Sequence, residues 1–471
     1  MGWMIYLILF LLSFVFMGLE IAAVRIITPY FGNSVYTWGS IITVFLMGSS
    51  IGYWLGGKSA DISNHKLWLK RYFIFCILMV SIIPYAAKFI LPYFRDLPEG
   101  MGTFIGASIL FILPNLMLSA IIPSLIKFSL AKEFSGTRIG SYHMISSIGS
   151  ILGTLLTTFV LLPNYHVNQL FSLFVFMLIS SFAIYLFQES NVNWKLIVFL
   201  APACLIPMIS PLAVSLSETK LVAQISSPYQ ELYVTEESSY RDQQGSFRFL
   251  QFSKGGYQGG MNIKDPEDYI FPYIRTMSNI VDVYHPSSQN VFMMGHGIGS
   301  LTRKISGQGK QMEVAEIDEK VLEISRIYFG YTGNEVKIGD GRVLLEKKTN
   351  SSLDVILLDA YSGSSIPFHL TTQEFFRMTH QKLKEDGIIL MNVIGRVNND
   401  SFIHAIHTTV SSVYSNIRIF APDPLSKDEQ NLFILASPGT LMSKPLKESS
   451  EIQVGKGKII LDGETQFIKV N

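Results

Sequence analysis

The distribution of apolar residues changes abruptly near residue 216, and this change constrains the fold more than any other feature of the chain. Long apolar runs fill the first half, whereas the second half mixes charged and apolar residues. Charged residues make up 15% of the 471 residues, below the roughly 25% that is usual in soluble proteins. The deficit falls in the first half, so we expect a membrane part followed by a soluble part.

Seven apolar runs in the first half are long enough to cross a bilayer, which takes about 20 residues per helix. The first run has no basic segment before it and no small-residue cleavage site, so we interpret it as a span and not as a signal peptide. Pro114 and Pro123 interrupt the fourth run, which could therefore be broken or re-entrant. The runs are residues 3–25, 37–57, 72–94, 103–130, 141–162, 168–187 and 196–216.

Polar side chains inside these runs are costly unless they are paired or used. Glu20 and Arg25 lie in or beside the first run, and they could form a structural ion pair between packed helices. The alternative is a polar cavity that admits a cationic or amphiphilic substrate, with Glu20 as its anionic wall. The spacing Gly149-x-x-x-Gly153 predicts a face where two helices pack closely.

Net charge and cysteine content exclude several classes of protein. The formal net charge is +1, so nothing indicates a nucleic-acid-binding protein. The only two cysteines, Cys76 and Cys204, lie in apolar runs, which excludes a disulfide scaffold and a cysteine-based zinc site. We expect no metal.

The soluble half predicts an α/β fold. Alternating strands at 232–235 and 247–252 predict a small β-sheet region over residues 217–285. From residue 286 to 471 strands and helices alternate, which is typical of a parallel, Rossmann-like sheet of the class I methyltransferase type. Strands are predicted at 290–295, 312–317, 335–338, 354–359, 387–393, 416–421 and 431–437, and helices at 319–328, 371–384 and 400–413.

A glycine-rich turn, Gly295-His296-Gly297-Ile298-Gly299-Ser300, follows the first strand of this domain. Glycine permits a tight turn and lets a ligand approach the backbone. Glu316 stands 21 residues after Gly295, at the end of the second strand, where a carboxylate accepts hydrogen bonds from ribose hydroxyls. Dinucleotide-binding loops need a glycine where Ser300 stands, so the spacing favours a nucleoside without a pyrophosphate.

Two more acids stand at predicted strand ends. Asp340, between Gly339 and Gly341, follows the third strand and could accept from an adenine amino group. Asp359 ends the fourth strand, at the carboxyl edge of the sheet. A sulfonium co-substrate carries its own electrophile, so the protein must orient and deprotonate the nucleophile, which Asp359 could do for an amine. The alternatives are solvated loop acids at 316 and 340 and an N-capping role for Asp359.

On these residues, positions 222–395 resemble the spermidine synthases, the polyamine aminopropyltransferases. With Glu20, Pro29-Tyr30-Phe31-Gly32 and Gly56-Gly57 in the apolar half, the chain is similar to the membrane-fused spermidine synthase-like proteins of bacteria. The resemblance implies decarboxylated S-adenosylmethionine or S-adenosylmethionine as co-substrate, and a Tyr in the amine site and a catalytic Asp, here Tyr273 and Asp359. The co-substrate residues that it implies are Gln230, Gln258, Gly295, Gly297, Gly299, Glu316, Asp340 and Gly341.

Several positions depart from the family pattern. Ile298 replaces the Asp that holds the aminopropyl chain, Ser362 replaces a second Asp after the catalytic one, and Ile274 replaces the Gln after the amine-site Tyr. The resemblance therefore implies nucleoside binding more strongly than a diamine pocket.

Three functions remain open. The first is a membrane-bound aminopropyltransferase with an amine acceptor, and the second is a methyltransferase acting on a lipid-borne or membrane-delivered substrate. The third is a non-enzymatic transporter or sensor of polyamines. The lipid bilayer is an expected partner of all three, and a homodimer is possible.

Sidedness follows from the Lys and Arg residues of the loops at 58–71 and 127–138, which are predicted to be cytoplasmic together with the N-terminus. Seven spans would then place the soluble part outside the cytoplasm, where its co-substrate is not made. We expect a multi-pass protein of the cell membrane and favour the cytoplasmic side for the soluble part, which requires that one run does not cross.

Overall fold

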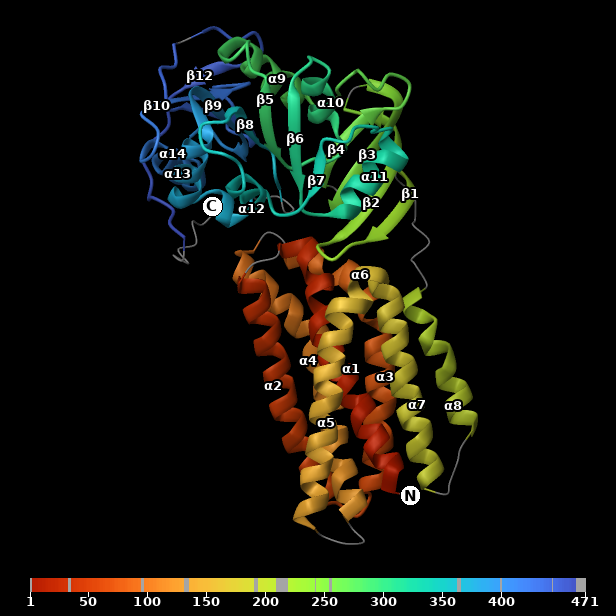
Figure 1. The fold of residues 1–471 in the computed structure, drawn as a ribbon. Helices are drawn as coiled ribbons and strands as arrows, with labels where there is room; N and C mark the ends of the chain where they lie inside the picture. Colours follow the sequence, from red (N-terminus) through yellow and green to blue (C-terminus); the bar gives the residue numbers. More distant parts are fainter. Residues whose placement is uncertain are drawn as a thin grey trace. The chain divides into compact units, whose positions relative to one another are not determined.

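The computed structural model describes a helical unit and an α/β unit (Figure 1). The helical unit comprises Met1–Ser217 with Ile225–Glu231, and the α/β unit comprises Glu218–Gln224 with Leu232–Asn471. The predicted boundaries at 216 and 285 do not separate residues 225–231, which group with the helices. The structure describes residues 2–32, 35–94, 97–130, 135–189, 194–208, 219–241, 243–253, 256–361, 366–398, 400–442 and 444–462.

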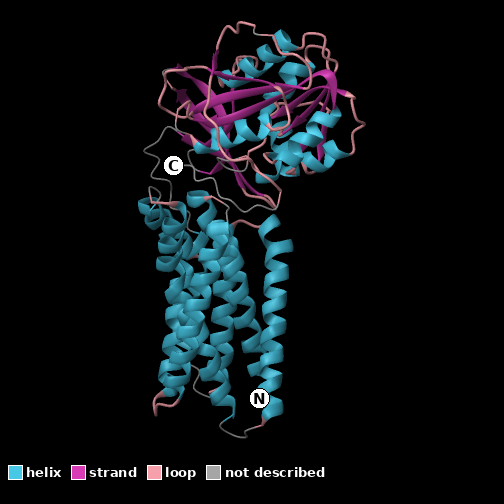
Figure 2. Cartoon of the chain, turned by 90° about the vertical axis from the view of Figure 1, so that its left-hand side faces the viewer, coloured by secondary structure: helices cyan, strands magenta, loops and turns pink. Residues whose placement is uncertain are grey.

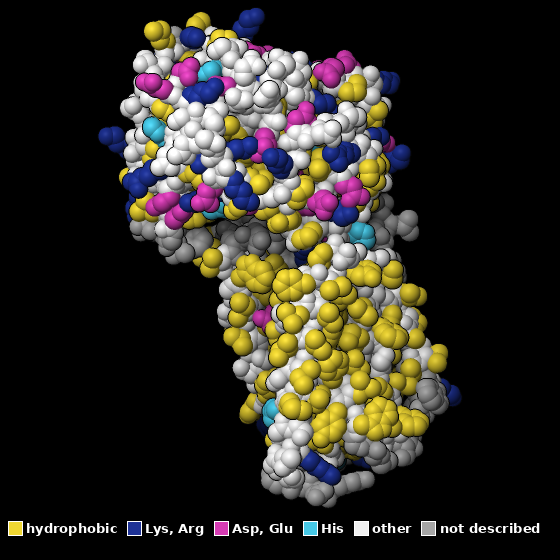
Figure 3. Space-filling model, viewed as in Figure 1, with side chains coloured by type: hydrophobic (Ala, Val, Ile, Leu, Met, Phe, Trp, Pro, Cys, Tyr) yellow, Lys and Arg dark blue, Asp and Glu magenta, His cyan; other side chains and the backbone are white. Residues whose placement is uncertain are grey.

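Six helices of the described residues are long and apolar enough to span a membrane, as a multi-pass protein requires. The fifth continues from α5 through a π-helical turn, Thr157–Leu161, into the short α6, Leu162–Asn164. On the face shown in Figure 3, hydrophobic side chains cover this unit. The main helices are α1 (Gly2–Phe31), α2 (Val35–Ala60), α3 (His65–Ile90), α4 (Glu99–Leu130), α5 (Gly136–Leu156) and α7 (Val167–Gln188).

The seventh predicted span, residues 196–216, is not one long helix. The apolar segment Lys195–Met208 is shorter than a span, and it consists of α8 (Trp194–Leu200) and two 3₁₀ turns, Ala201–Cys204 and Ile206–Met208. Pro202 and Pro207 stand in those turns, and proline cannot donate the backbone hydrogen bond that a helix interior needs. Residues 209–218 lie outside the described residues.

The fourth predicted span is intact, and the expectation of a broken or re-entrant segment is wrong there. Helix α4 runs without interruption through Pro114 and Pro123. Neighbouring helices satisfy the backbone groups that proline frees in such a helix.

Glycines bring the helices of this unit into close contact. A Cβ atom at Gly149 or Gly153 of α5 would lie 2.5 Å from a backbone oxygen of α1. A Cβ atom at Gly52 or Gly56 of α2 would lie 2.4 or 2.3 Å from a backbone oxygen of α4. The small-residue spacing therefore has the packing role predicted from the sequence, and α5 packs on α1 while α2 packs on α4.

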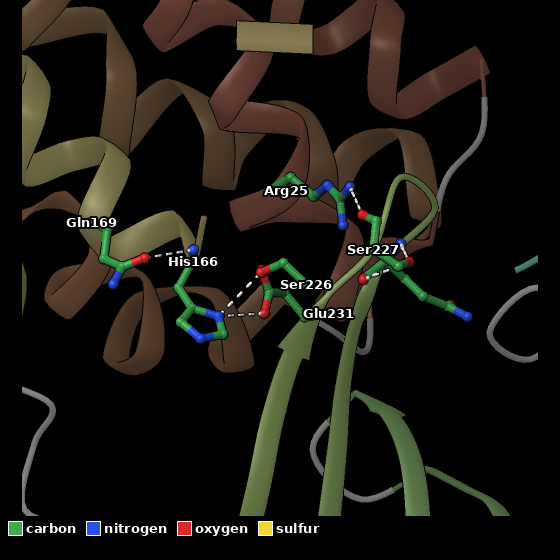
Figure 4. Close-up of polar contacts among 7 residues, drawn as sticks. Arg25, His166, Gln169, Ser226, Ser227 and Glu231 are labelled. Carbon is green, nitrogen blue, oxygen red and sulfur yellow. Dashed lines mark hydrogen bonds and ion pairs between the residues drawn. The ribbon is translucent and has the colours of Figure 1, made fainter. Parts of the chain in front are cut away.

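Residues 225–231 form the tip of the first β-hairpin, and Figure 4 shows their contacts with the helices. The imidazole Nδ1 of His166, between α6 and α7, lies 3.0 Å from the Ser226 hydroxyl and 3.3 Å from the Glu231 carboxylate. Arg25 of α1 donates a hydrogen bond to the backbone oxygen of Ser227. The hairpin tip therefore lies at the end of the bundle where α7 begins.

The opposite end of the bundle is marked by ion pairs. Lys66 and Lys70 near the start of α3 lie 3.7 and 2.8 Å from the Glu189 carboxylate, directly after α7. Because α7 runs from Val167 to Gln188, these ion pairs and the hairpin tip mark opposite ends of the bundle.

The α/β unit contains two sheets (Figure 2). The smaller has the order β1-β2-β3-β4, and the β2–β3 and β3–β4 pairs are antiparallel. Its strands are β1 (Thr219–Ser226), β2 (Glu231–Tyr240), β3 (Gln243–Ser253) and β4 (Gly256–Asn262). The alternating residues at 232–235 and 247–252 lie in β2 and β3.

The larger sheet has eight strands in the order β12-β10-β11-β9-β8-β5-β6-β7. The pairs from β9 through β8, β5 and β6 to β7 are parallel, whereas β11 pairs antiparallel with β9 and β10, so the sheet is mixed. The strands are β5 (Asn290–Met294), β6 (Gln311–Glu316), β7 (Val336–Ile338), β8 (Leu353–Leu358), β9 (Leu383–Gly395), β10 (Asn416–Ala421), β11 (Gln430–Ser437) and β12 (Ser450–Ile452).

Helices cover both faces of the larger sheet. Phe292 and Met294 of β5 pack in a core with α12, α13 and α14, whereas Val291 and Met293 point to the other face and pack with α9 and α10. The helices are α9 (Pro272–Tyr284), α10 (Ser300–Ser306), α11 (Glu319–Phe329), α12 (Gly341–Glu346), α13 (Gln373–Lys382) and α14 (Ser401–Ser411). This is the α/β arrangement that the alternating pattern predicts.

Candidate nucleoside and transfer site

The glycine loop joins β5 to α10 at the carboxyl edge of the larger sheet. Gly295, Gly297 and Gly299 all have positive φ angles, which other residues rarely adopt. A Cβ atom at Gly295 would lie 2.1 Å from the backbone oxygen of Asp359, so only glycine fits at this approach of the loop to β8. The neighbours β5 and β8 connect onward to opposite sides, and α/β proteins bind ligands at such switch points.

Glu316 ends β6 beside this loop and is buried. Its Oε2 accepts a 3.0 Å hydrogen bond from the backbone N–H of His296. Its Oε1 accepts a 3.0 Å hydrogen bond from the backbone N–H of Asp318. Burial raises the pKa of Glu316, and the backbone donors oppose that shift. Each carboxylate oxygen keeps a lone pair, so Glu316 can still accept from ribose hydroxyls while it fixes the loop.

Asp340 caps α12 and holds two partners already. Its Oδ1 accepts from the Val343 backbone N–H at 3.0 Å, and its Oδ2 lies 2.9 Å from Nε2 of His369. An adenine amino group at Asp340 would therefore share the carboxylate with His369. The next residue, Gly341, packs against Met294 so closely that a Cβ atom there would lie 2.7 Å from the methionine side chain.

The two predicted glutamines lie in different units. Gln258 is in β4, and its backbone oxygen is 3.8 Å from the position of a Cβ atom at Gly297, so β4 passes over the glycine loop. Gln230 lies in the hairpin tip of the helical unit, where its backbone N–H donates to the Ser227 hydroxyl at 3.0 Å. The structure brings Gln258 to the loop, whereas the role of Gln230 stays a prediction.

Asp359 follows β8 and is held by three contacts. Its backbone N–H donates to the Met294 backbone oxygen at 3.0 Å, which ties it to the base of the glycine loop. The Asn392 amide of β9 donates to Asp359 Oδ1 at 2.8 Å, and the Tyr273 hydroxyl of α9 also bonds to the carboxylate. Asn431 of β11 donates in turn to Asn392 at 2.9 Å. Asn392 and Asn431 therefore form a chain of two side chains that holds the carboxylate, and Tyr273 holds it separately.

The surroundings of Asp359 suit a proton acceptor. Burial raises the pKa of Asp359, and the hydrogen bonds from Asn392 and Tyr273 oppose the rise. Burial and the Asp359 charge hold the pKa of Tyr273 well above its ordinary value, so Tyr273 stays a donor to the carboxylate. A general base works best when its pKa approaches the working pH. Asp359 does not cap a helix, because Ala360 and Tyr361, the described residues directly after it, are not helical.

Apolar residues stand at two positions where the family has polar ones. Ile298 is 3% exposed and packs against Gly259. A Cβ atom at Gly259 would lie 2.7 Å from the Ile298 side chain. Ile274 is 1% exposed and belongs to the core between α9 and the sheet. Neither can hold an ammonium group. Ser362, the third departure, lies outside the described residues.

Three contributors to the site were missed from the sequence. His296 is buried inside the loop, with Nε2 3.0 Å from the Ser325 hydroxyl and Nδ1 3.3 Å from Thr302. Burial and Arg303 lower the pKa of His296 to about 4, so it is a neutral packing and hydrogen-bonding group. His369 and Asn392 are the other two. A signal existed for Asn392, because it is a lone polar residue in the apolar run of β9.

Comparisons with known proteins give the domain type. Residues 270–434 match the family model described as the spermine/spermidine synthase domain. A polyamine aminopropyltransferase of Vibrio vulnificus is 28% identical over 46% of this chain and 73% of its own length. One of Bacillus cereus is 31% identical over 30% of this chain and 52% of its own length. An N-terminal histidine N-methyltransferase of Emericella nidulans is 27% identical over 37% of this chain and 33% of its own length.

Among solved structures, a probable spermidine synthase from Corynebacterium glutamicum has a TM-score of 0.43 and 17% identity, covering 50% of this chain and 95% of that one. Spermidine synthase from Thermotoga maritima has a TM-score of 0.36 and 21% identity, covering 47% of this chain and 73% of that one. The match over 270–434 includes the glycine loop, Glu316, Asp340 and Asp359. The C-terminal half of the chain therefore carries a spermine/spermidine synthase domain, a transferase domain, behind a helical region that fits a membrane part.

Proposed function

We propose that the protein is a membrane-bound transferase that moves an aminopropyl group from decarboxylated S-adenosylmethionine to an amine acceptor. The observation that carries the proposal is that Glu316 and Asp359 both flank the base of the glycine loop. Glu316 contacts the loop through His296 N–H, and Asp359 contacts it through the Met294 carbonyl. A nucleoside on Glu316 would thus present its sulfonium on the side of Asp359.

The transfer step needs one proton acceptor and no redox partner. The acceptor nitrogen forms a bond to the carbon beside the sulfonium, the carbon–sulfur bond breaks, and sulfur keeps the electron pair as a neutral thioether. The proton of the amine goes to Asp359, which Tyr273 and Asn392 hold in place. Holding the two reactants in line supplies much of the rate. The proposed co-substrate residues are Gln230, Gln258, Gly295, Gly297, Gly299, Glu316, Asp340 and Gly341.

Methyl transfer from S-adenosylmethionine is the second candidate, and Ile298 favours it. An isoleucine packed against Gly259 cannot hold the ammonium of an aminopropyl chain. The similarity to a histidine N-methyltransferase also supports this chemistry. The acceptor would then be a small amine or a lipid-borne substrate, and no metal is needed in either reaction. The domain match gives no support to a purely non-enzymatic sensor.

The deciding experiment compares the two donors on the full-length protein in detergent, with a mixture of amines as acceptors. Aminopropyl transfer releases methylthioadenosine, whereas methyl transfer releases S-adenosylhomocysteine. Release of methylthioadenosine that depends on an amine supports the first proposal. Release of S-adenosylhomocysteine alone replaces it with the second, and binding of neither donor contradicts both.

A further inference from the structure

The helical unit contains a cavity of about 980 Å³ that the transferase proposal does not use. It lies among α1, α2, α4 and α5, in the half of the bundle that holds the basic loops. The lining residues are Ser13, Phe16, Tyr53, Ile122, Pro123, Ile126, Lys127, His143, Ser146, Ser147, Ser150 and Ile151.

Two walls of this cavity differ in chemistry. The α5 wall is polar, because His143, Ser146, Ser147 and Ser150 are spaced to share one face of the helix. The α4 wall is apolar along Ile122, Pro123 and Ile126 and ends at Lys127, near the C-terminus of the helix. A ligand that fits both walls has a polar side and an apolar side.

The Ser146 hydroxyl shows that the polar wall is incomplete. Its Oγ is buried and has no hydrogen-bond partner among the described residues. By contrast, the Ser141 and Thr154 hydroxyls of the same helix donate to backbone oxygens one turn earlier, at 2.8 and 3.0 Å. A buried hydroxyl without a partner costs free energy. Rotation of the Ser146 side chain toward the cavity that it lines would let a ligand bond to this hydroxyl and remove that cost.

The charged groups of the lining favour a ligand with a negative charge. Among the residues that the structure describes, Lys127 and His143 are the only ionisable groups of the lining besides Tyr53, and none of the lining side chains is a carboxylate. Asp61 pairs with Lys127, but its side chain is 76% exposed, and such surface pairs are weak and exchange readily. A cationic polyamine would find no counter-charge, whereas a phosphate would find an ammonium, an imidazole and hydroxyl donors.

We propose that this groove binds an anionic phospholipid. The phosphate lies at Lys127, His143 and Ser146, and an acyl chain follows the α4 wall toward Phe16. Lys127 stands near the end of α4, where a lipid headgroup is found at the edge of the bilayer. The basic loops at that end attract anionic lipids as well. The proposal does not depend on the chemistry of the transferase domain.

Native mass spectrometry of the full-length protein with phosphatidylglycerol or phosphatidylcholine tests the site. Wild type should retain phosphatidylglycerol roughly tenfold better, the effect of one charge-assisted contact. The double variant Lys127→Gln, His143→Gln should lose that preference without losing phosphatidylcholine. Ser147→Phe should exclude both lipids from the groove. Ser141→Phe, on another face of α5, is the matched control and should retain the preference.

A cooperative thermal unfolding transition shows that each variant is folded. If Ser147→Phe does not fold, the double variant Lys127→Gln, His143→Gln (the charge variant) still tests the proposal. The proposal is wrong if the charge variant keeps the lipid preference, or if a folded Ser147→Phe protein retains phosphatidylglycerol as wild type does. Retention of glycerol phosphate alone would replace the lipid with a soluble phosphate. If spermidine binds and displaces the lipid, the ligand of the groove is a cation and the proposal of an anionic ligand is wrong.

Discussion

The side-chain amide of Asn392 donates a 2.8 Å hydrogen bond to the carboxylate of Asp359, from the strand next to the one that Asp359 follows. The contact favours the ionised carboxylate and opposes the rise of its pKa on burial. Asn392 therefore sets both the orientation and the proton affinity of the proposed base.

Replacing Asn392 by Ala should move the acid limb of the pH–rate profile to higher pH. The base must be deprotonated, so activity falls as pH falls through the pKa of Asp359. Loss of the donor raises that pKa and moves the fall upward. Asn431→Ala, which removes only the support behind Asn392, should shift the limb less. If the acid limb stays at the same pH while the rate falls equally at every pH, Asn392 has only a structural role.

Asp359→Asn should abolish transfer and spare co-substrate binding. Asparagine keeps the shape of the side chain but cannot accept the proton, and loss of a general base typically costs about 10²–10⁴ in rate. Single-turnover rates and calorimetry with methylthioadenosine measure the two effects separately. Full activity in this variant would assign the proton to another group, and Tyr273 would be tested next.

Glu316→Gln should weaken methylthioadenosine binding by about 1.5–3 kcal/mol, the cost of losing a hydrogen bond to a charged partner. Glutamine keeps one oxygen for the loop backbone, so the change tests the ribose contact more cleanly than alanine does. Calorimetry on the full chain gives the affinity, and Glu346→Gln, an exposed acid of α12, is the control. Equal affinity in the two variants would remove Glu316 from the site.

His166 and Glu231 should make stability depend on pH. The Glu231 hydrogen bond raises the pKa of His166, so the contact stabilises the folded protein fully below the unfolded pKa, about 6.5. That stabilisation is lost as pH rises through the folded pKa. His166→Gln should therefore lower the thermal midpoint most below pH 6.5. In a Glu231→Gln background the same change should have no pH-dependent effect, and a persisting one would contradict the pairing.

The two ends of the bundle should label from opposite sides of the membrane. In a cysteine-free background, Ser63→Cys reports the basic loop and Tyr229→Cys reports the hairpin tip, where Tyr229 is 51% exposed. An impermeant reagent should reach only one of the two in intact cells, because the six candidate spans separate the two ends of the bundle. Labelling of both or neither would contradict that separation. Ser351→Cys should label with Tyr229→Cys, because no candidate span of the described residues lies between them. Labelling of this pair from outside would contradict the cytoplasmic side that co-substrate supply favours.

Most of the fold follows from local patterns, and the parts that do not have identifiable causes. Hydropathy predicted six helices because each is a continuous apolar run. It did not predict the short helix and two 3₁₀ turns within Trp194–Met208, because hydropathy ignores Pro202 and Pro207. The glycine loop and Glu316 were predictable because their spacing is local. The Asp359–Asn392 and Asp340–His369 contacts join residues 33 and 29 positions apart, so only the assembled sheet reveals them.

The hairpin tip also bears on how such a protein arises and how it can be rebuilt. Ser227 and Glu231 are buried, and their partners Arg25 and His166 belong to the helices. An enzyme cut free at residue 217 would lose those partners and expose a glutamate that is normally covered. Exchanging either half by recombination at the hydropathy boundary would therefore require matching changes in α1 and before α7.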